Sequence, residues 1–105
     1  MKVLLVDDSS AIAKVVGEML KEAGFSHERA ENGKVATEIL SKTNDFDLIL
    51  LDWNMPQMDG IEFLKFNKEH NLTKAPIVMM TTENKPEKIL KALENGASEY
   101  IMKPF

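Results

Sequence analysis

The chain alternates between short apolar runs and longer amphipathic stretches. Short runs of Val, Ile, Leu and Met are typical of strands that a parallel sheet buries on both faces. The stretches between them repeat their apolar residues at helical spacing, and one run is weak and polar, as expected of an edge strand. We predict strands at residues 2–6, 26–30, 47–51, 76–81 and 99–102, of which 26–30 is the polar one.

Four helices are predicted between these strands. The first follows Ser9 or Ser10, because either hydroxyl can cap a helix, and it continues to about residue 23, where Gly24 stops it. The others are predicted to begin at Asn32-Gly33, to cover about residues 60–69, and to run from Pro86 in the first turn to Gly96. Repeated β–α units of this kind predict an α/β fold, a parallel sheet with helices on both faces.

No predicted helix follows the last predicted strand, so one face of the sheet would lack cover. The sequence ends there with Lys103-Pro104-Phe105. Leaving about 300 Å² of apolar surface in water forgoes roughly 7–8 kcal/mol, which is comparable to the stability of a whole domain. We therefore expect the isolated chain to be marginally stable or to self-associate.

Composition narrows the class of protein. The 105 residues have the length of one domain, which we place at residues 1–105. The chain is 44% hydrophobic and 29% charged, and its net charge of −4 without a basic stripe argues against nucleic-acid binding. The absence of cysteine excludes disulfides and thiolate metal sites. With no signal peptide and no run long enough to span a bilayer, we predict a soluble, cytoplasmic domain that binds no membrane.

Carboxylates close two of the apolar runs. Asp7 and Asp8 follow residues 3–6, and Asp52 follows residues 48–51. The carboxyl edge of a parallel sheet is where α/β proteins place their sites, so the three acids converge if the two strands are neighbours. At about 5 Å and an effective dielectric constant of about 20, each pair of ionised carboxylates repels by about 3 kcal/mol. Three such oxygen donors predict a site for a hard cation, and Mg²⁺ suits them.

Two further residues, Thr81 and Lys103, also stand at the ends of predicted strands. The chain carries, in this order, the segments Val-Asp-Asp (6–8), Leu-Asp-Trp-Asn-Met-Pro (51–56), Met-Asp-Gly (58–60), Met-Thr-Thr-Glu (80–83), Gly-Ala-Ser-Glu-Tyr (96–100) and Lys-Pro-Phe (103–105). Together they resemble the CheY-like receiver domains of two-component response regulators. The resemblance implies a flavodoxin-like, doubly wound, five-stranded parallel sheet of order 2-1-3-4-5, the order known for CheY-like proteins. Receivers normally continue into a fifth helix, so it also implies a domain truncated before its last helix.

The resemblance implies a chemical role for each acid. Asp52 would be the phosphoacceptor, which takes a phosphoryl group from the phosphohistidine of a histidine kinase or from a small acyl phosphate. Mg²⁺ is expected at Asp7, Asp8, Asp52 and the backbone carbonyl of Asn54, with Asp8 as a direct ligand and Asp7 as a contact through water. Taken alone, Asp52 could simply close a strand and Asp8 could cap the following helix.

Lys103 and Thr81 are expected to contact the phosphoryl oxygens, one by its charge and the other by its hydroxyl. The family also implies a cis peptide bond between Lys103 and Pro104. Thr81 and Tyr100 resemble the family's switch pair, in which phosphorylation draws the hydroxyl inward and the ring moves into the space. A half-buried strand aromatic is the simpler interpretation of Tyr100, and it is compatible with switching.

Asn54 and Glu83 occupy positions that tune hydrolysis of the aspartyl phosphate in the family, and Thr82 is bulkier than the residue common there. The predicted function is a phosphorylation-activated receiver of chemotaxis type that switches conformation to bind a flagellar motor or an output domain. It is predicted not to be an enzyme, beyond self-phosphorylation and autodephosphorylation. The alternatives are the receiver of a multidomain regulator, a Mg²⁺-dependent phosphatase with an aspartyl nucleophile, and a phosphorylation-independent scaffold.

Overall fold

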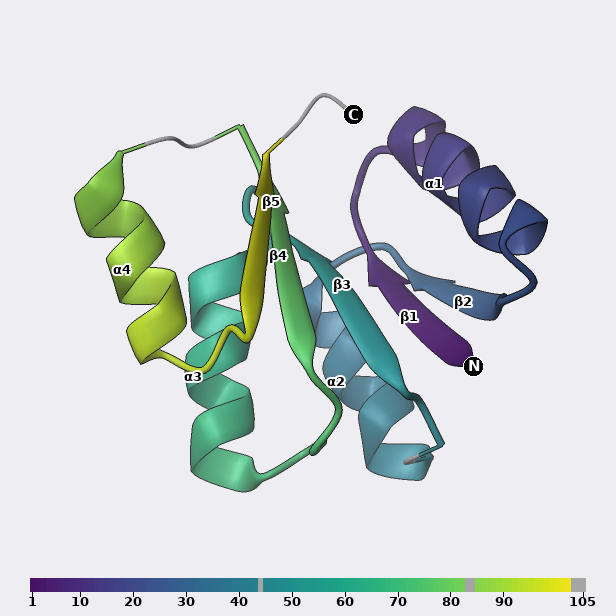
Figure 1. The fold of residues 1–105 in the computed structure, drawn as a ribbon. Helices are drawn as coiled ribbons and strands as arrows, with labels where there is room; N and C mark the ends of the chain where they lie inside the picture. Colours follow the sequence, from purple (N-terminus) through teal and green to yellow (C-terminus); the bar gives the residue numbers. More distant parts are fainter. Residues whose placement is uncertain (44, 83–84, 103–105) are drawn as a thin grey trace.

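The computed structural model describes residues 1–43, 45–82 and 85–102. Its strands form one parallel sheet in the order β2-β1-β3-β4-β5 (Figure 1). The strands are β1 (Lys2–Val6), β2 (Ser26–Ala30), β3 (Leu48–Asp52), β4 (Ile77–Thr81) and β5 (Glu99–Met102). The predicted fold class and strand order are confirmed.

The helices of the described residues are α1 (Ser10–Glu22), α2 (Gly33–Lys42), α3 (Gly60–His70) and α4 (Pro86–Glu94). None of them has the length and apolar character needed to cross a membrane. Some predicted bounds differ slightly from those observed. β4 starts at Ile77 rather than at Pro76, because proline has no N–H to donate to the ladder. β3 extends to Asp52, which pairs with Met80 of β4.

Side chains that cap the helices fix where each helix begins. The Ser9 hydroxyl accepts a hydrogen bond from the backbone N–H of Ile12 at 3.3 Å, and Asn32 caps α2 in the same way. Asp59 and Glu62 form a capping box at the start of α3. Each of these helices follows the carboxyl end of a strand, which is the edge where the predicted site lies.

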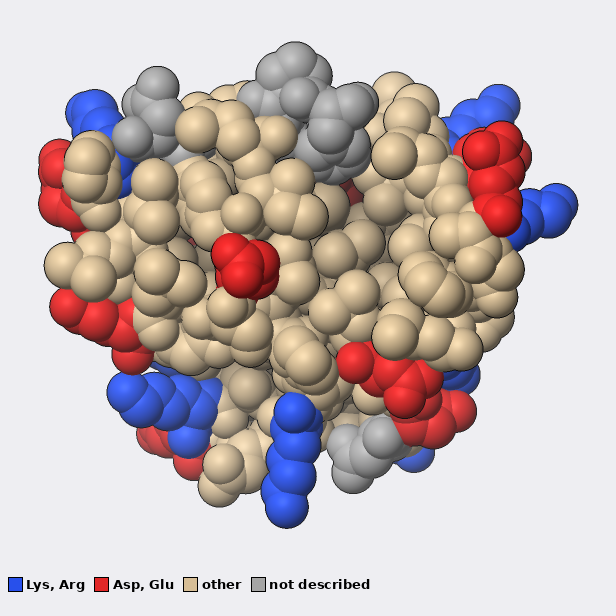
Figure 2. All heavy atoms as spheres, in the orientation of Figure 1, with Lys and Arg blue, Asp and Glu red and all other residues tan. Residues whose placement is uncertain are grey.

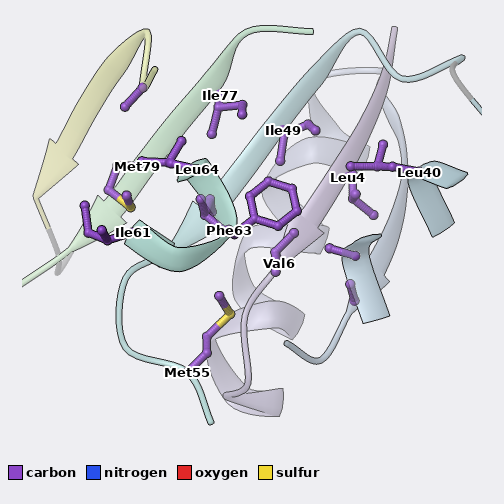
Figure 3. Packing of buried hydrophobic residues seen from close by; sticks show 14 of the residues in the cluster. Leu4, Val6, Leu40, Ile49, Met55, Ile61, Phe63, Leu64, Ile77 and Met79 are labelled. Carbon is purple, nitrogen blue, oxygen red and sulfur yellow. The ribbon is translucent and has the colours of Figure 1, made fainter. Parts of the chain in front are cut away.

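The hydrophobic core lies on both faces of the sheet, and the two faces are unequally covered. On one face α2, α3 and α4 pack against the strands, and Figure 3 shows Phe63 of α3 beside Val6 and Ile49. On the other face, α1 is the one helix among the described residues, and it packs through Ala13 and Val16.

The sparsely covered face exposes apolar side chains. Ile101 of β5 is 41% exposed and Met19 of α1 is 51% exposed. A groove of about 290 Å³ between these elements is lined by Val16, Met19, Leu20, Leu50, Met80 and Ile101. Figure 2 shows this side of the molecule with few charged side chains near its centre. Within the described ranges, the cover is therefore as uneven as the sequence predicts.

At the amino end of the strands, opposite the edge of the predicted site, Lys2 at the start of β1 holds neighbouring segments together. Its backbone N–H donates to Asp47 at 2.8 Å, and its ammonium group lies 3.2 Å from Asp45 and 4.8 Å from the centroid of the Phe46 ring. A hydrogen bond from the Thr43 hydroxyl, together with the Lys2 ammonium, holds the pKa of Asp45 below its usual value. These contacts join the segment before β3 to β1 and support the pairing of the two strands whose ends carry the acids.

Candidate functional site

Three carboxylates meet at the carboxyl edge of the sheet. Asp7 follows the last residue of β1, Asp52 is the last residue of β3, and these two strands are paired. One carboxylate oxygen from each of Asp7, Asp8 and Asp52 lies within 4.8 Å of the other two. The acids therefore converge, as the pattern of strand ends predicts.

Burial makes this cluster costly without a cation. The Asp7 side chain is fully buried and Asp52 is 6% exposed, whereas Asp8 is exposed. At such separations each pair of ionised carboxylates repels by about 3 kcal/mol at an effective dielectric constant of about 20. A divalent cation between the oxygens replaces that repulsion by attraction. The donor set fits Mg²⁺, which prefers carboxylate oxygens and keeps several of its waters.

Asp7 is anchored by its neighbours, whereas Asp8 is not. One Asp7 carboxylate oxygen accepts a hydrogen bond from the N–H of Ser9 at 2.9 Å, and the N–H of Asp7 donates to the carbonyl of Ala30 at 3.1 Å. The Asp8 carboxylate makes no hydrogen bond within the described part of the chain, and Ser9 rather than Asp8 caps α1. Helix capping therefore does not account for Asp8, whose carboxylate remains available to a cation.

Thr81 lies on the next strand of the same edge. It is the last residue of β4, and β4 pairs with β3 so that Asp52 lies opposite Met80. The Thr81 side chain is 1% exposed. A buried hydroxyl on the strand adjacent to Asp52 is thus placed at the same end of the sheet as the acids.

The other predicted site residues are only partly described. Lys103, its peptide bond with Pro104, and Glu83 lie outside the described residues. Asn54 is exposed in the loop after β3, and Tyr100 of β5 packs half-buried against the larger core cluster. Tyr100 is therefore a partly buried strand aromatic, and its role in switching stays a prediction.

The loop between β3 and α3 is fixed by close backbone contacts. The N–H of Gly60 donates to the carbonyl of Trp53 at 2.8 Å. A Cβ atom on Gly60 would lie 2.8 Å from the carbonyl oxygen of Asp52, and one on Gly33 of α2 would lie 2.8 Å from that of Met58. Residues without a side chain are therefore needed at both positions for the loop to pack this tightly beside Asp52.

Arg29 also lies near the site, although the sequence did not indicate it. Its guanidinium group donates from Nε and Nη2 to the backbone carbonyl of Asp7, at 3.2 and 3.1 Å. No motif surrounds Arg29 in the polar strand β2, and it is the parallel pairing of β1 with β2 that brings it to Asp7.

The chain matches a known family over nearly its whole length. Residues 3–105 match the family described as the response regulator receiver domain. The chain is 41% identical over 107 residues to the chemotaxis protein CheY-3 of Vibrio cholerae, and the match covers 100% of this chain and 82% of that protein. It is 38% identical to a chemotaxis protein CheY homolog of Campylobacter jejuni, with the same coverage.

Solved structures agree with the fold. The chemotaxis protein CheY4 of Vibrio cholerae matches with a TM-score of 0.90 at 42% identity, covering 99% of this chain and 87% of that one. The receiver domain of the Francisella response regulator 1452 also gives a TM-score of 0.90, at 35% identity, with 99% and 84% covered. These matches confirm the predicted flavodoxin-like fold.

Proposed function

We propose, for a chain that belongs to the family of response regulator receiver domains, that Asp52 accepts a phosphoryl group and that its phosphorylation shifts the domain between two conformations. The domain is CheY-like, and because relatives of the chain are chemotaxis proteins, the process we propose is two-component signalling of chemotaxis type. It is a signalling module rather than a classical enzyme. The observation that carries the proposal is the approach of Asp7, Asp8 and Asp52 to within 4.8 Å.

In the proposed reaction, a carboxylate oxygen of Asp52 attacks the phosphorus of a phosphohistidine on a histidine kinase, or of a small acyl phosphate. A P–O bond forms as the P–N bond of the phosphohistidine breaks, and the electron pair of that bond remains on the departing imidazole, which takes up a proton. With an acyl phosphate, the P–O bond to the acyl oxygen breaks instead, and its electron pair leaves with the carboxylate. Water that later attacks the same phosphorus would break the P–O bond to Asp52, release inorganic phosphate and return Asp52 to its free carboxylate, which is the proposed autodephosphorylation.

The acids of the cluster are the proposed metal ligands. Asp7, Asp8, Asp52 and the backbone carbonyl of Asn54 would hold Mg²⁺, which when bound supplies positive charge to the phosphoryl oxygens. The burial of Asp7 and Asp52 supports this assignment, because burial strengthens the repulsion between neighbouring carboxylates and a cation would relieve it.

Residues at the neighbouring strand ends would bind the phosphoryl group and transmit its presence. Thr81, buried at the end of β4, is proposed to donate its hydroxyl to a phosphoryl oxygen, and Lys103 to balance the charge. Movement of Thr81 toward the phosphoryl group would leave space for the Tyr100 ring, which is the proposed switch. Asn54 and Glu83 are proposed to tune the rate of hydrolysis.

The proposed partners are a histidine kinase, which donates the phosphoryl group, and a downstream protein that binds the phosphorylated form. Leu90 and Leu93 of α4 are 56% and 42% exposed, and such side chains support protein binding there. The apolar groove beside α1 supports self-association as a further property of this chain. A cytoplasmic location is part of the proposal, and the absence of cysteine supports it.

The test is the intact mass of the protein after incubation with Mg²⁺ and a small acyl phosphate, with Trp53 fluorescence recorded alongside. The wild-type chain should gain the mass of one phosphoryl group, and its fluorescence should respond first to Mg²⁺ and then to the donor. Asp52→Asn should show neither the mass gain nor the response to the donor. Glu18→Gln, which changes an exposed acid of α1 outside the cluster, is the control and should behave as wild type.

Two results would contradict the proposal. Phosphorylation that persists in Asp52→Asn would place the acceptor at another residue. Repeated release of phosphate from a sugar phosphate by the wild-type chain would favour the phosphatase alternative, because a receiver has no substrate beyond its phosphodonor.

A further inference from the structure

The one arginine of the chain, Arg29, binds a single backbone oxygen beside the acids. Its Nε and Nη2 atoms both donate to the carbonyl oxygen of Asp7, at 3.2 and 3.1 Å. A guanidinium fork that closes on one acceptor fixes the position and the direction of that acceptor. Arg29 is half-buried, so these hydrogen bonds are partly shielded from water.

β2 directs Arg29 toward the face of the sheet that carries α1. Side chains of a strand alternate between faces, so Arg29 points to the same face as His27. His27 contacts α1, since a Cβ atom on Gly17 would lie 2.8 Å from Nε2 of His27. Arg29 pairs with Leu5, near the end of β1, and so lies where the chain passes from β1 into α1.

The carbonyl group of Asp7 belongs to the peptide that leads into Asp8. Asp7 is anchored at its N–H by Ala30, at its carboxylate by Ser9, and at its carbonyl by Arg29. The Asp8 carboxylate has no comparable contact within the described part of the chain, so its direction depends on the peptide that Arg29 holds. We propose that Arg29 is a positioning residue, which fixes the Asp7–Asp8 peptide and so keeps the Asp8 carboxylate at the cation site. This inference rests on the proposed function, in which the cluster holds Mg²⁺.

Arg29 affects a cation at this site in two opposing ways. Its positive charge repels the cation, so removal of the charge alone would tighten Mg²⁺ binding. Its hydrogen bonds hold the peptide before Asp8, and the loss of a group that orients a metal ligand lowers affinity by about tenfold or more. We expect positioning to dominate, so the direction of the change in Mg²⁺ affinity separates the two effects.

The experiment measures the dissociation constant of Mg²⁺ for the whole chain, by calorimetry and by Trp53 fluorescence. Arg29→Gln removes the charge and the fork, whereas Arg29→Lys keeps the charge without the fork. Lys42→Gln is the matched control, because Lys42 is an exposed cation at the end of α2, which packs on the opposite face of the sheet. We expect binding to weaken about tenfold in Arg29→Gln, to weaken also in Arg29→Lys, and to stay unchanged in Lys42→Gln.

A second readout requires no metal. In the metal-free protein, the amide ¹H–¹⁵N signals of Asp8 and of the adjacent Ser9 should shift and broaden in Arg29→Gln, because the Asp7–Asp8 peptide loses its hydrogen bonds to Arg29. They should keep their wild-type positions in Lys42→Gln. Urea unfolding establishes that each variant is folded. If Arg29→Gln does not fold, Arg29→Lys is compared with the wild type instead.

The outcomes separate this inference from the proposed function. Unchanged or tighter Mg²⁺ binding in the folded Arg29 variants overturns the positioning role and leaves the phosphoacceptor role of Asp52 intact. Wild-type protein that binds no Mg²⁺ overturns the positioning role together with the proposed metal site. Wild-type protein that binds Mg²⁺ but is not phosphorylated contradicts the proposed function alone, and weaker binding in both Arg29 variants then still supports the positioning role.

Discussion

At the scale of single residues, the acids that form the site act against the stability of the fold. Asp7 and Asp52 are both buried, and their carboxylates lie within 4.8 Å of each other and of Asp8. A buried ionised carboxylate is costly unless hydrogen bonds or an opposite charge compensate it. The arrangement that prepares a cation site therefore lowers stability whenever the cation is absent.

Replacing Asp8 with Asn should consequently raise the free energy of unfolding in the absence of Mg²⁺. Because Asp8 is exposed, solvent screens its repulsion of the other two acids, and we expect a gain of about 1 kcal/mol. Adding Mg²⁺ should stabilise the wild-type chain and have little effect on Asp8→Asn, because a ligand stabilises the folded state according to its affinity. Urea unfolding with and without Mg²⁺ measures both effects.

Glu18→Gln is the control for this prediction, since Glu18 is an exposed acid of α1 outside the cluster. It removes an equal charge and should change neither the stability without Mg²⁺ nor the response to Mg²⁺. If Asp8→Asn proves less stable than wild type without Mg²⁺, Asp8 makes a structural contact and the electrostatic account of the cluster is wrong.

The positions of the acids could be predicted from the sequence, because carboxylates that directly follow an apolar run indicate the end of a buried strand. The cap of α1 could not be assigned, because Ser9 and Ser10 both carry a hydroxyl and only the backbone decides in favour of Ser9. Arg29 could not be predicted at all. Its partner is the backbone carbonyl of Asp7, 22 residues away. Because every residue has a backbone carbonyl, the sequence does not indicate which of them a distant side chain will contact.

At the scale of elements, the site depends on how the loop before α3 approaches the end of β3. Gly60 is the first residue of α3, and a Cβ atom there would lie 2.8 Å from the carbonyl oxygen of Asp52 and 3.0 Å from the Cα of Trp53. Both obstacles are backbone atoms, which cannot rotate away as a side chain can. A side chain at position 60 must therefore move the strand end that carries Asp52.

Gly60→Ala should lower the free energy of unfolding by about 1–3 kcal/mol, the usual cost of forcing an atom into a filled site. Gly17→Ala is the matched control in α1, because the nearest atoms there belong to the ring of His27, which is exposed and can move aside. Alanine also favours a helix over glycine by about 1 kcal/mol, so Gly17→Ala should be neutral or stabilising. Urea unfolding measures both variants, and equal losses would show that the backbone contact at Gly60 is not what matters.

Most elements could be predicted because each has its own local signal. The observed bounds of β1, β2 and β5 coincide with the predicted ones, although residues 26–30 form a polar run rather than an apolar one. β3 includes Asp52, because hydrogen bonding to β4 continues one residue beyond the apolar run. Hydrophobicity thus marks where a strand is buried, whereas the ladder decides where the strand ends.

At the scale of the whole molecule, the sequence predicted that helices cover the two faces of the sheet unequally, but periodicity alone did not predict the order of the strands. Counting helices against strands indicates that one face lacks a helix. The strand order followed from the resemblance to receiver domains, because periodicity within a strand carries no information about its neighbours. Met19 of α1 and Ile101 of β5 line the same groove, and this arrangement depends on the complete fold.

This groove should make the chain associate weakly with itself. If two copies each bury about 300 Å² of apolar surface, the gain is about 15 kcal/mol. The loss of freedom on association offsets about 4–15 kcal/mol of it. The small surplus corresponds to a dissociation constant on the order of 100 µM, which sedimentation velocity over a range of concentrations can measure.

Two lysine substitutions test whether the groove is responsible. Ile101→Lys places a charge in the groove and should shift the chain toward monomer, because a buried ammonium group is costly to desolvate. Leu90→Lys adds the same charge on α4, which packs on the opposite face, so this variant should associate as the wild type does. A wild-type chain that remains monomeric at about 1 mM contradicts the prediction. Equal loss of association in both variants would mean that net charge, rather than the uncovered face of the sheet, controls how copies meet.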